Sequence, residues 1–140
     1  WLKNFLHTQR VLVMATVINN RPYCNLMSFA CTNNCSIIVI TPRDTSKYAN
    51  LVQNDQVSLL ITDSSGEQSE TVNNTAITIN GRAKEIEAGS TRKELEDIYM
   101  AKYPQLKDFV QSETSALFRI DPVLIVSPDD FYRVKEVHFE

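Results

Sequence analysis

The chain has 140 residues, of which 43% are hydrophobic, enough to fill one sizeable core, so we expect a single domain over residues 1–140. A formal net charge of −3 at pH 7 and the lack of any Lys/Arg cluster argue against nucleic acid as a partner. No apolar run reaches the roughly eighteen residues of a membrane span, so a soluble protein with no membrane partner is expected.

The first part of the chain is predicted to form a short helix and then a β-hairpin. Residues 1–8 place apolar side chains at helical spacing, which indicates a short amphipathic helix. Residues 11–18 are apolar except for Thr16, so this strand is expected to be covered on both faces. A polar turn at residues 19–22 leads to a second strand over residues 23–32, which completes the hairpin.

A strand, a hydroxyl-rich loop and a helix follow between residues 36 and 54. The β-branched run at residues 37–41 predicts a buried strand, and Pro42 ends it. Asp44 or Thr45 is expected to cap the helix, because a side-chain oxygen there can accept from its free backbone N–H groups. The apolar positions of this helix fall at i, i+3 and i+4: Tyr48, Leu51 and Val52.

The start of this helix is a candidate phosphate site. The predicted turn gathers hydroxyl and cationic side chains around backbone N–H groups that carry partial positive charge, which suits a terminal phosphate monoester. The side chains belong to Thr41, Arg43, Thr45, Ser46 and Lys47. The alternative is that they are ordinary capping and solvated residues of a surface turn.

The remaining chain is expected to supply four more strands and two helical segments. The strands are predicted at residues 57–61, 75–87, 116–126 and 131–139, with a polar loop at residues 63–74. Gly81 is expected to mark a bulge or a close approach of two backbones. Thr91 and Glu94 form a predicted capping box for a helix that Pro104 ends, and a short helical segment follows over residues 106–110.

Strands therefore dominate the chain, and the helices are few and peripheral. Six or seven strands joined mostly by short polar turns predict a mainly β fold, an antiparallel barrel with peripheral helices. The first strand carries apolar residues on both sides: Val11, Val13, Ala15 and Val17 on one, Leu12, Met14 and Ile18 on the other. The second strand is expected to add Leu26, Met27 and Phe29 to the outward surface. Because only one side can face the barrel interior, a homodimer is expected to cover the other.

The three cysteines, Cys24, Cys31 and Cys35, are an odd number in a chain long enough to fold without disulfides. They favour free thiols in a reducing compartment, so a cytoplasmic location is expected. No metal site is expected, because Cys31 and Cys35 would need further ligands and His7 and His138 lie at opposite ends of the chain. No side chain stands out as a catalytic acid or base.

The order of these motifs resembles the pyridoxamine 5′-phosphate oxidase-like, FMN-binding split-barrel superfamily. The likeness is carried by LVMATVINNRPYCNLMSFACTNNCSIIVITPRDTSKYANLVQNDQVSLLIT at residues 12–62 and by AITINGRAK at residues 76–84. It covers nearly the whole chain and implies a six- to seven-stranded antiparallel split barrel.

The resemblance also implies a set of FMN contacts. Residues that would line the isoalloxazine ring are Asn25, Leu26, Met27 and Ser28, continued by Ile40 and Thr41. Ser46 and Lys47 would bind the FMN phosphate, at the position that the residue types alone also indicate. Without a ligand, residues 25–28 would be plain barrel wall, since an alternating strand shows the same pattern.

Four positions depart from the pattern of the vitamin-forming oxidase of this superfamily. That enzyme has Arg at the positions of Asn25 and Ser46, Lys at that of Ala30 and Gln at that of Ala76. The C-terminal end also lacks the Arg-containing tail of that enzyme. The likeness is therefore to the short FMN-binding members of the superfamily.

The resemblance implies a homodimeric FMN-dependent oxidoreductase, in which the flavin supplies the electron chemistry for a substrate that the sequence does not identify. The alternative is a non-catalytic module that holds flavin or haem as a sensor, store or electron carrier. Haem would need an axial ligand, for which His7 and His138 are candidates. A third possibility is a split barrel that has lost its cofactor.

Overall fold

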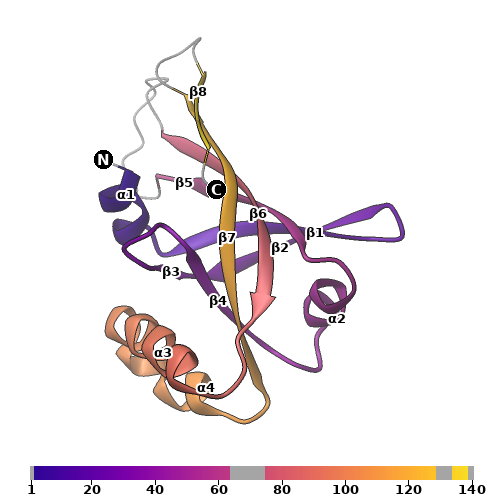
Figure 1. Ribbon diagram of the computed structural model, residues 1–140, viewed down its shortest axis with the longest axis vertical. Coiled ribbons are helices and arrows are strands. Elements are labelled where there is room, and N and C mark those ends of the chain that lie inside the picture. Colours follow the sequence, from indigo (N-terminus) through magenta and orange to yellow (C-terminus); the bar gives the residue numbers. More distant parts are fainter. Residues whose placement is uncertain (1, 64–74, 129–133, 139–140) are drawn as a thin grey trace.

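A computed structural model describes residues 2–63, 75–128 and 134–138 and shows one strongly curved antiparallel sheet with helices around it (Figure 1). Its strands are β1 (Val11–Ile18), β2 (Arg21–Ser28), β3 (Ala30–Cys31), β4 (Ile37–Pro42), β5 (Gln56–Thr62), β6 (Ala76–Glu85), β7 (Ser115–Pro128) and β8 (Val134–His138). The helices are α1 (Leu2–Thr8), α2 (Ser46–Gln53), α3 (Ser90–Lys102) and α4 (Lys107–Gln111), and a 3-10 turn, η1, spans Pro104–Leu106. The predicted mainly β class is confirmed, whereas most of the predicted loop at residues 63–74 lies outside the described residues.

The sheet is so strongly curled that the strands at its two ends, β2 and β3, are consecutive in the sequence. Its strand order is β2-β1-β5-β6-β7-β4-β3, and β8 pairs with β7. The two end strands, β2 and β3, are separated only by Phe29. Together they are the strand predicted over residues 23–32, and its division at Phe29 is why eight strands are found where six or seven were expected. The split-barrel architecture follows from this curling.

The hairpin predicted near the N-terminus joins β1 to β2 through a two-residue turn. Asn19 and Asn20 have φ of 51° and 61°, the left-handed conformation that twists a tight hairpin correctly and that Asn tolerates. Alternate β1 residues Leu12, Met14 and Thr16 are buried, while Val11, Val13 and Ala15 face outward. As expected, β1 carries apolar residues on both sides, and one side faces the core while the other faces outward.

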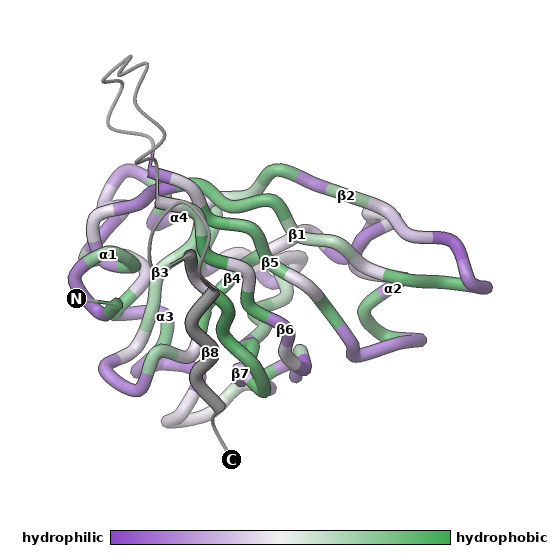
Figure 2. The backbone as a smooth tube through the Cα atoms, turned by 90° about the horizontal axis from the view of Figure 1, so that it is seen from above, coloured by the Kyte–Doolittle hydropathy of each residue, from purple (hydrophilic) through white to green (hydrophobic). Residues whose placement is uncertain are grey.

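Two hydrophobic cores share strand β4. Ile37 and Val39 point into the barrel with residues such as Met14, Phe29 and Phe118. Ile38 and Ile40 point the other way and pack with Leu95, Tyr99 and Leu117 under α3 and α4. Seen from above, apolar residues follow the central strands, and polar residues gather at the turns (Figure 2). Burial on both faces explains why residues 37–41 form an uninterrupted β-branched run.

Helix α2 begins as predicted but packs differently. Thr45 is its N-cap and accepts a hydrogen bond from the backbone N–H of Tyr48 at 3.2 Å. The prediction that Val52 lies on the packed side of this helix is wrong, because its side chain is 62% exposed. Asn50 is buried instead and donates to the Thr16 hydroxyl at 3.1 Å, so two core polar groups satisfy each other.

The predicted capping box of α3 is also wrong, whereas the expectation for Gly81 is confirmed. Helix α3 begins at Ser90 with Gly89 as its N-cap, at a φ of 154°, and no side chain caps it, so Thr91 already lies inside the helix. At Gly81 the register of β6 against β7 shifts. A Cβ there would lie 2.7 Å from the Asp121 carbonyl oxygen, a close approach that only glycine allows.

The described helices are short. Within those ranges, none combines the length and the apolar character that crossing a bilayer requires.

Candidate functional site

A pocket of about 370 Å³ lies where β2 and β4 meet α2 and the α3–α4 region. Its walls are Leu26, Met27, Ser28, Ile40, Pro42, Lys47, Tyr99, Leu106 and Phe109. Five of the eight residues predicted to bind FMN are among them: Leu26, Met27, Ser28, Ile40 and Lys47. Segments that are distant in sequence are thus brought to one cavity, as the resemblance implies.

The pocket is mostly apolar and carries one charge. Met27 and Ile40 are buried in its wall, and Leu26 is 70% exposed at its rim. Ser28 and Tyr99 supply hydroxyl groups, and Lys47 is the one charged lining residue. In the described part of the chain no ion pair involves Lys47, so its ammonium is available to a ligand. A cavity with apolar walls and a few polar groups is typical of a small-molecule site.

Threonine side chains organise the loop that carries Lys47 without lining the pocket. Thr45 Oγ1 donates to the Pro42 carbonyl at 2.9 Å as well as capping α2. Thr41 is fully buried, and its hydroxyl lies 3.1 Å from that of Thr45. The first N–H groups of α2, which have no intrahelical partner, are therefore held in a fixed position beside Lys47.

The remaining predicted residues lie near the pocket but outside its walls. Ser46 is exposed as the first residue of α2, and Asn25 is half-buried on β2. Arg43, which sequence grouped with this site, is turned away and pairs with Glu85 at 2.7 Å. The pocket thus has one cation, Lys47, where the sequence predicted two for a phosphate.

One wall of the pocket was missed by sequence reasoning. Tyr99 comes from α3, Leu106 from η1 and Phe109 from α4. Their apolar spacing indicated helices that pack, but it did not indicate which strands they face. Burial raises the pKa of Tyr99, with a smaller contribution from Tyr103, so its hydroxyl stays protonated at neutral pH.

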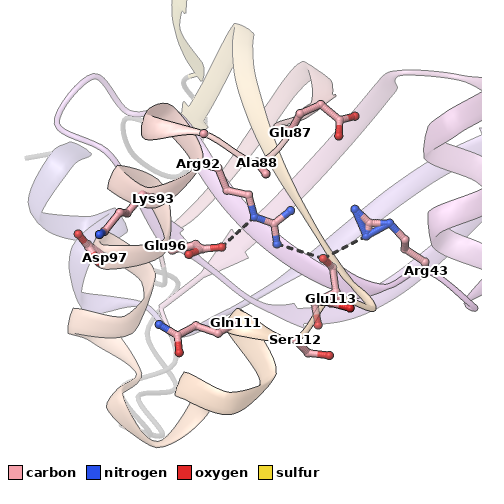
Figure 3. Close-up of a pocket in the computed structure, with 12 residues that line it drawn as sticks. Arg43, Glu87, Ala88, Arg92, Lys93, Glu96, Asp97, Gln111, Ser112 and Glu113 are labelled. Carbon is pink, nitrogen blue, oxygen red and sulfur yellow. Dashed lines mark hydrogen bonds and ion pairs between the residues drawn. The ribbon is translucent and has the colours of Figure 1, made fainter.

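A larger cavity, of about 440 Å³, lies beside α3 and contains Arg43 and Arg92 (Figure 3). Their guanidinium groups donate to the same carbonyl, that of Ser115, at 3.2 and 3.1 Å. Arg43 also pairs with Glu85, and Arg92 pairs with Glu96 at 2.8 Å. Both arginines therefore fasten α3 and the β4–α2 loop to β7. Because each already has a carboxylate and a carbonyl partner, few of their N–H donors remain for a ligand.

Comparison of the sequence with protein families identifies a family whose profile covers most of the chain. The profile described as pyridoxamine 5′-phosphate oxidase matches residues 2–126. No curated protein matches the chain.

Solved structures share the fold at low sequence identity. A haem-binding protein from Mycobacterium smegmatis superposes with a TM-score of 0.85 at 12% identity, covering 97% of this chain and 57% of that one. The haem storage protein HutZ from Vibrio cholerae gives 0.75 at 22% identity, covering 86% and 87%. General Stress Protein 26 from Bacillus anthracis gives 0.70 at 21% identity, covering 99% and 98%. This chain therefore spans little more than half of the Mycobacterium protein.

Proposed function

Because this chain belongs to the pyridoxamine 5′-phosphate oxidase family, we propose that it is a homodimeric flavoprotein that binds FMN in the Lys47 pocket and acts as an oxidoreductase. The observation that carries the proposal is the position of Lys47. It is the one charged side chain of an apolar pocket, it has no ion pair in the described residues, and it follows the capped start of α2.

The residues fit FMN in two parts. Leu26 and Ile40 offer apolar side chains to the isoalloxazine ring, and Ser28 offers a hydroxyl group. Met27 would contribute its backbone, because its side chain points into the barrel core. Lys47, Ser46 and the N–H groups of α2 offer positive charge and hydrogen-bond donors to the phosphate. Thr41 acts indirectly by holding Thr45, and Asn25 would lie at the edge of the site.

Bound flavin would supply the electron transfer, and the protein would supply position and electrostatics. The ionisable groups that line the pocket are Lys47 and Tyr99. Tyr99 stays protonated, since burial raises its pKa, so it can donate a hydrogen bond but cannot act as a base near neutral pH. The protein's part in catalysis would therefore be to orient flavin and substrate and to exclude water.

FMN is expected to bind more tightly than riboflavin, which has the same ring without the phosphate. Charge-assisted hydrogen bonds to the phosphate should be worth about 1.5–3 kcal/mol, or roughly a 10- to 150-fold difference in Kd. Titration of apo-protein with each flavin, followed by flavin fluorescence, measures the ratio. Equal affinities, or no binding of either flavin, would refute the proposed phosphate site.

Haem binding is the second candidate, because two structures with this fold are described as haem-binding or haem storage proteins. Haem iron prefers an axial His, Cys, Met or Tyr. Neither His nor Cys lines the pocket within the described residues, and His7 contacts Cys31 at another cavity. The Met27 side chain points into the barrel core, and burial keeps the Tyr99 hydroxyl protonated. Neither residue therefore offers a ready axial ligand, and the pocket fits flavin better than haem.

An absorption spectrum of freshly purified protein separates these candidates. Flavin bands would support the proposal, a Soret band would support haem, and a colourless protein that takes up neither would indicate a barrel without cofactor. Bound flavin that nicotinamide nucleotides cannot reduce would point to a sensor, store or electron carrier instead of an enzyme.

The proposed homodimer would cover the outward side of β1. Large apolar side chains are exposed on β1 and its neighbours in the sheet: Val11 (39%), Leu26 (70%) and Leu60 (41%). The expectation that Met27 and Phe29 join this surface is wrong, because both point into the core at 7% and 0% exposure. A symmetric partner packed on this surface would also lie beside Leu26 and could complete the flavin site.

Sedimentation equilibrium at micromolar concentration is expected to give twice the chain mass of 16.0 kDa. Leu60 lies opposite Val13 on the outward side, so Leu60→Asp should shift the mass toward the monomer. Lys84→Asp, at an exposed position of β6, is the matched control and should remain dimeric. A flavin-bound wild-type protein at 16.0 kDa would defeat both the dimer and the shared site.

A further inference from the structure

A separate pocket of about 390 Å³ lies where α1, β3 and α3 meet. It is lined by His7, Ala30, Cys31, Thr32, Asn33, Ile98, Ala101 and Lys102. It shares no lining residue with the Lys47 pocket. No acidic residue is among the groups that line it, although the whole chain has a net charge of −3.

Lys102 is a cation without a counter-ion in this pocket. Its ammonium lies 4.3 Å from the centroid of the Phe29 ring and donates to the carbonyl groups of Leu6, at 3.4 Å, and Gln9. These partners are dipoles and a π-face, and none carries a formal negative charge. Across the described residues, no carboxylate lies within ion-pair distance of this amine.

The neighbours of Lys102 leave the local charge positive. Arg10 lies over the Tyr103 ring at 4.9 Å, and the His7 ring lies 3.5 Å from Cys31 Sγ. Burial raises the pKa of the Cys31 thiol to about 11, so it is neutral at pH 7. Burial, with a contribution from Arg10, lowers the pKa of Lys102 to about 8. Below that pH the pocket holds a partly buried positive charge that an anion would stabilise.

We propose that this pocket binds a small organic carboxylate. The carboxylate would lie against the Lys102 ammonium, with the Asn33 amide and the Thr32 hydroxyl at the polar end of the pocket. Ala30, Ile98 and Ala101 would contact the hydrocarbon part. A single cation favours a monoanion, and a cavity of this volume favours a small molecule.

The simpler role for Lys102 is to fasten α1 to α3 through the Leu6 and Gln9 carbonyls. Both roles can coexist, because an ammonium has three donors. The two roles predict different results when an anion is added. If Lys102 only fastens α1 to α3, the protein should not bind the anion.

Isothermal titration with benzoate and with benzamide tests the proposal, because the two differ chiefly in charge. Near pH 6.5, benzoate is expected to bind at least about tenfold more tightly than benzamide, since Lys102 is then protonated. The preference should fall as the pH rises through about 8 and be lost near pH 9.5, because the amine becomes neutral. Equal binding of the two, or binding of neither at millimolar concentration, would overturn the proposal.

Two variants separate the carboxylate site from the fastening of α1. Lys102→Met keeps the length of the side chain and should reduce benzoate affinity to that of benzamide. Lys93→Met, at an exposed position of the same helix, is the matched control and should change nothing. Ile98→Asp would place a carboxylate in the pocket wall, leave Lys102 intact and still abolish the preference for benzoate. Retained preference in Lys102→Met and Ile98→Asp would overturn the proposal.

The carboxylate pocket does not depend on the flavin proposal. FMN affinity is expected to be unchanged in Lys102→Met, because the two pockets share no residue. A protein that binds benzoate but no flavin would therefore refute only the proposed function.

Discussion

Replacing Phe29 with alanine is expected to lower the free energy of unfolding by about 3–5 kcal/mol. The side chain is fully buried in the barrel core at the point where β2 gives way to β3. Its removal would leave a cavity and would take the π-face away from the Lys102 ammonium, 4.3 Å from its centroid. The loss is a large part of the roughly 5–15 kcal/mol that keeps a typical domain folded.

Urea denaturation followed by circular dichroism measures this effect. Tyr23→Ala is the matched control, because Tyr23 is an aromatic residue of the same segment that is 43% exposed. Tyr23→Ala is expected to lower the free energy of unfolding by less than half as much as Phe29→Ala. Equal costs for the two variants would show that the junction of β2 and β3 does not hold the core together.

Lys47→Met is expected to weaken FMN binding by roughly 10- to 150-fold and to leave riboflavin binding unchanged. The variant keeps the unbranched side chain and removes the charge proposed to meet the phosphate. Flavin fluorescence titrations of both ligands give the two ratios. A loss confined to FMN would identify the phosphate as the group that Lys47 contacts.

Lys84→Met provides the control for a general loss of positive charge, since Lys84 is an exposed cation on β6. Both flavins should bind it as they bind the wild type. If Lys47→Met weakens FMN and riboflavin equally, Lys47 contributes to pocket shape and the phosphate lies elsewhere.

Local patterns in the sequence predicted much of the fold. The apolar run of β1, the β-branched run of β4 and the Asn19–Asn20 turn each depend on neighbouring residues, so their structure could be predicted without knowing the rest of the chain. The cap at Thr45 follows from the same kind of local rule. The predicted start of α3 was wrong, because Gly89 begins this helix without the side-chain hydrogen bond on which the capping-box rule relies.

Longer-range features could not be predicted from local patterns. The break at Phe29 arises because one segment pairs with β1 on one side of it and with β4 on the other. Arg43 was grouped with the pocket because it is close to Lys47 in sequence, but its partner Glu85 lies at the end of β6. Tyr99 reaches the pocket only through the packing of α3 on β4.

The double pairing of residues 21–31 constrains how the length of the chain can change. Ser28 is in register with Val11 of β1, and Ala30 is in register with Ile38 of β4. Inserting or deleting one residue between these positions would shift one end of the sheet against the other and turn alternate side chains from core to solvent. Changes in length should therefore be tolerated at the Asn19–Asn20 turn, where two added residues only extend a hairpin, and be rejected on either side of Phe29.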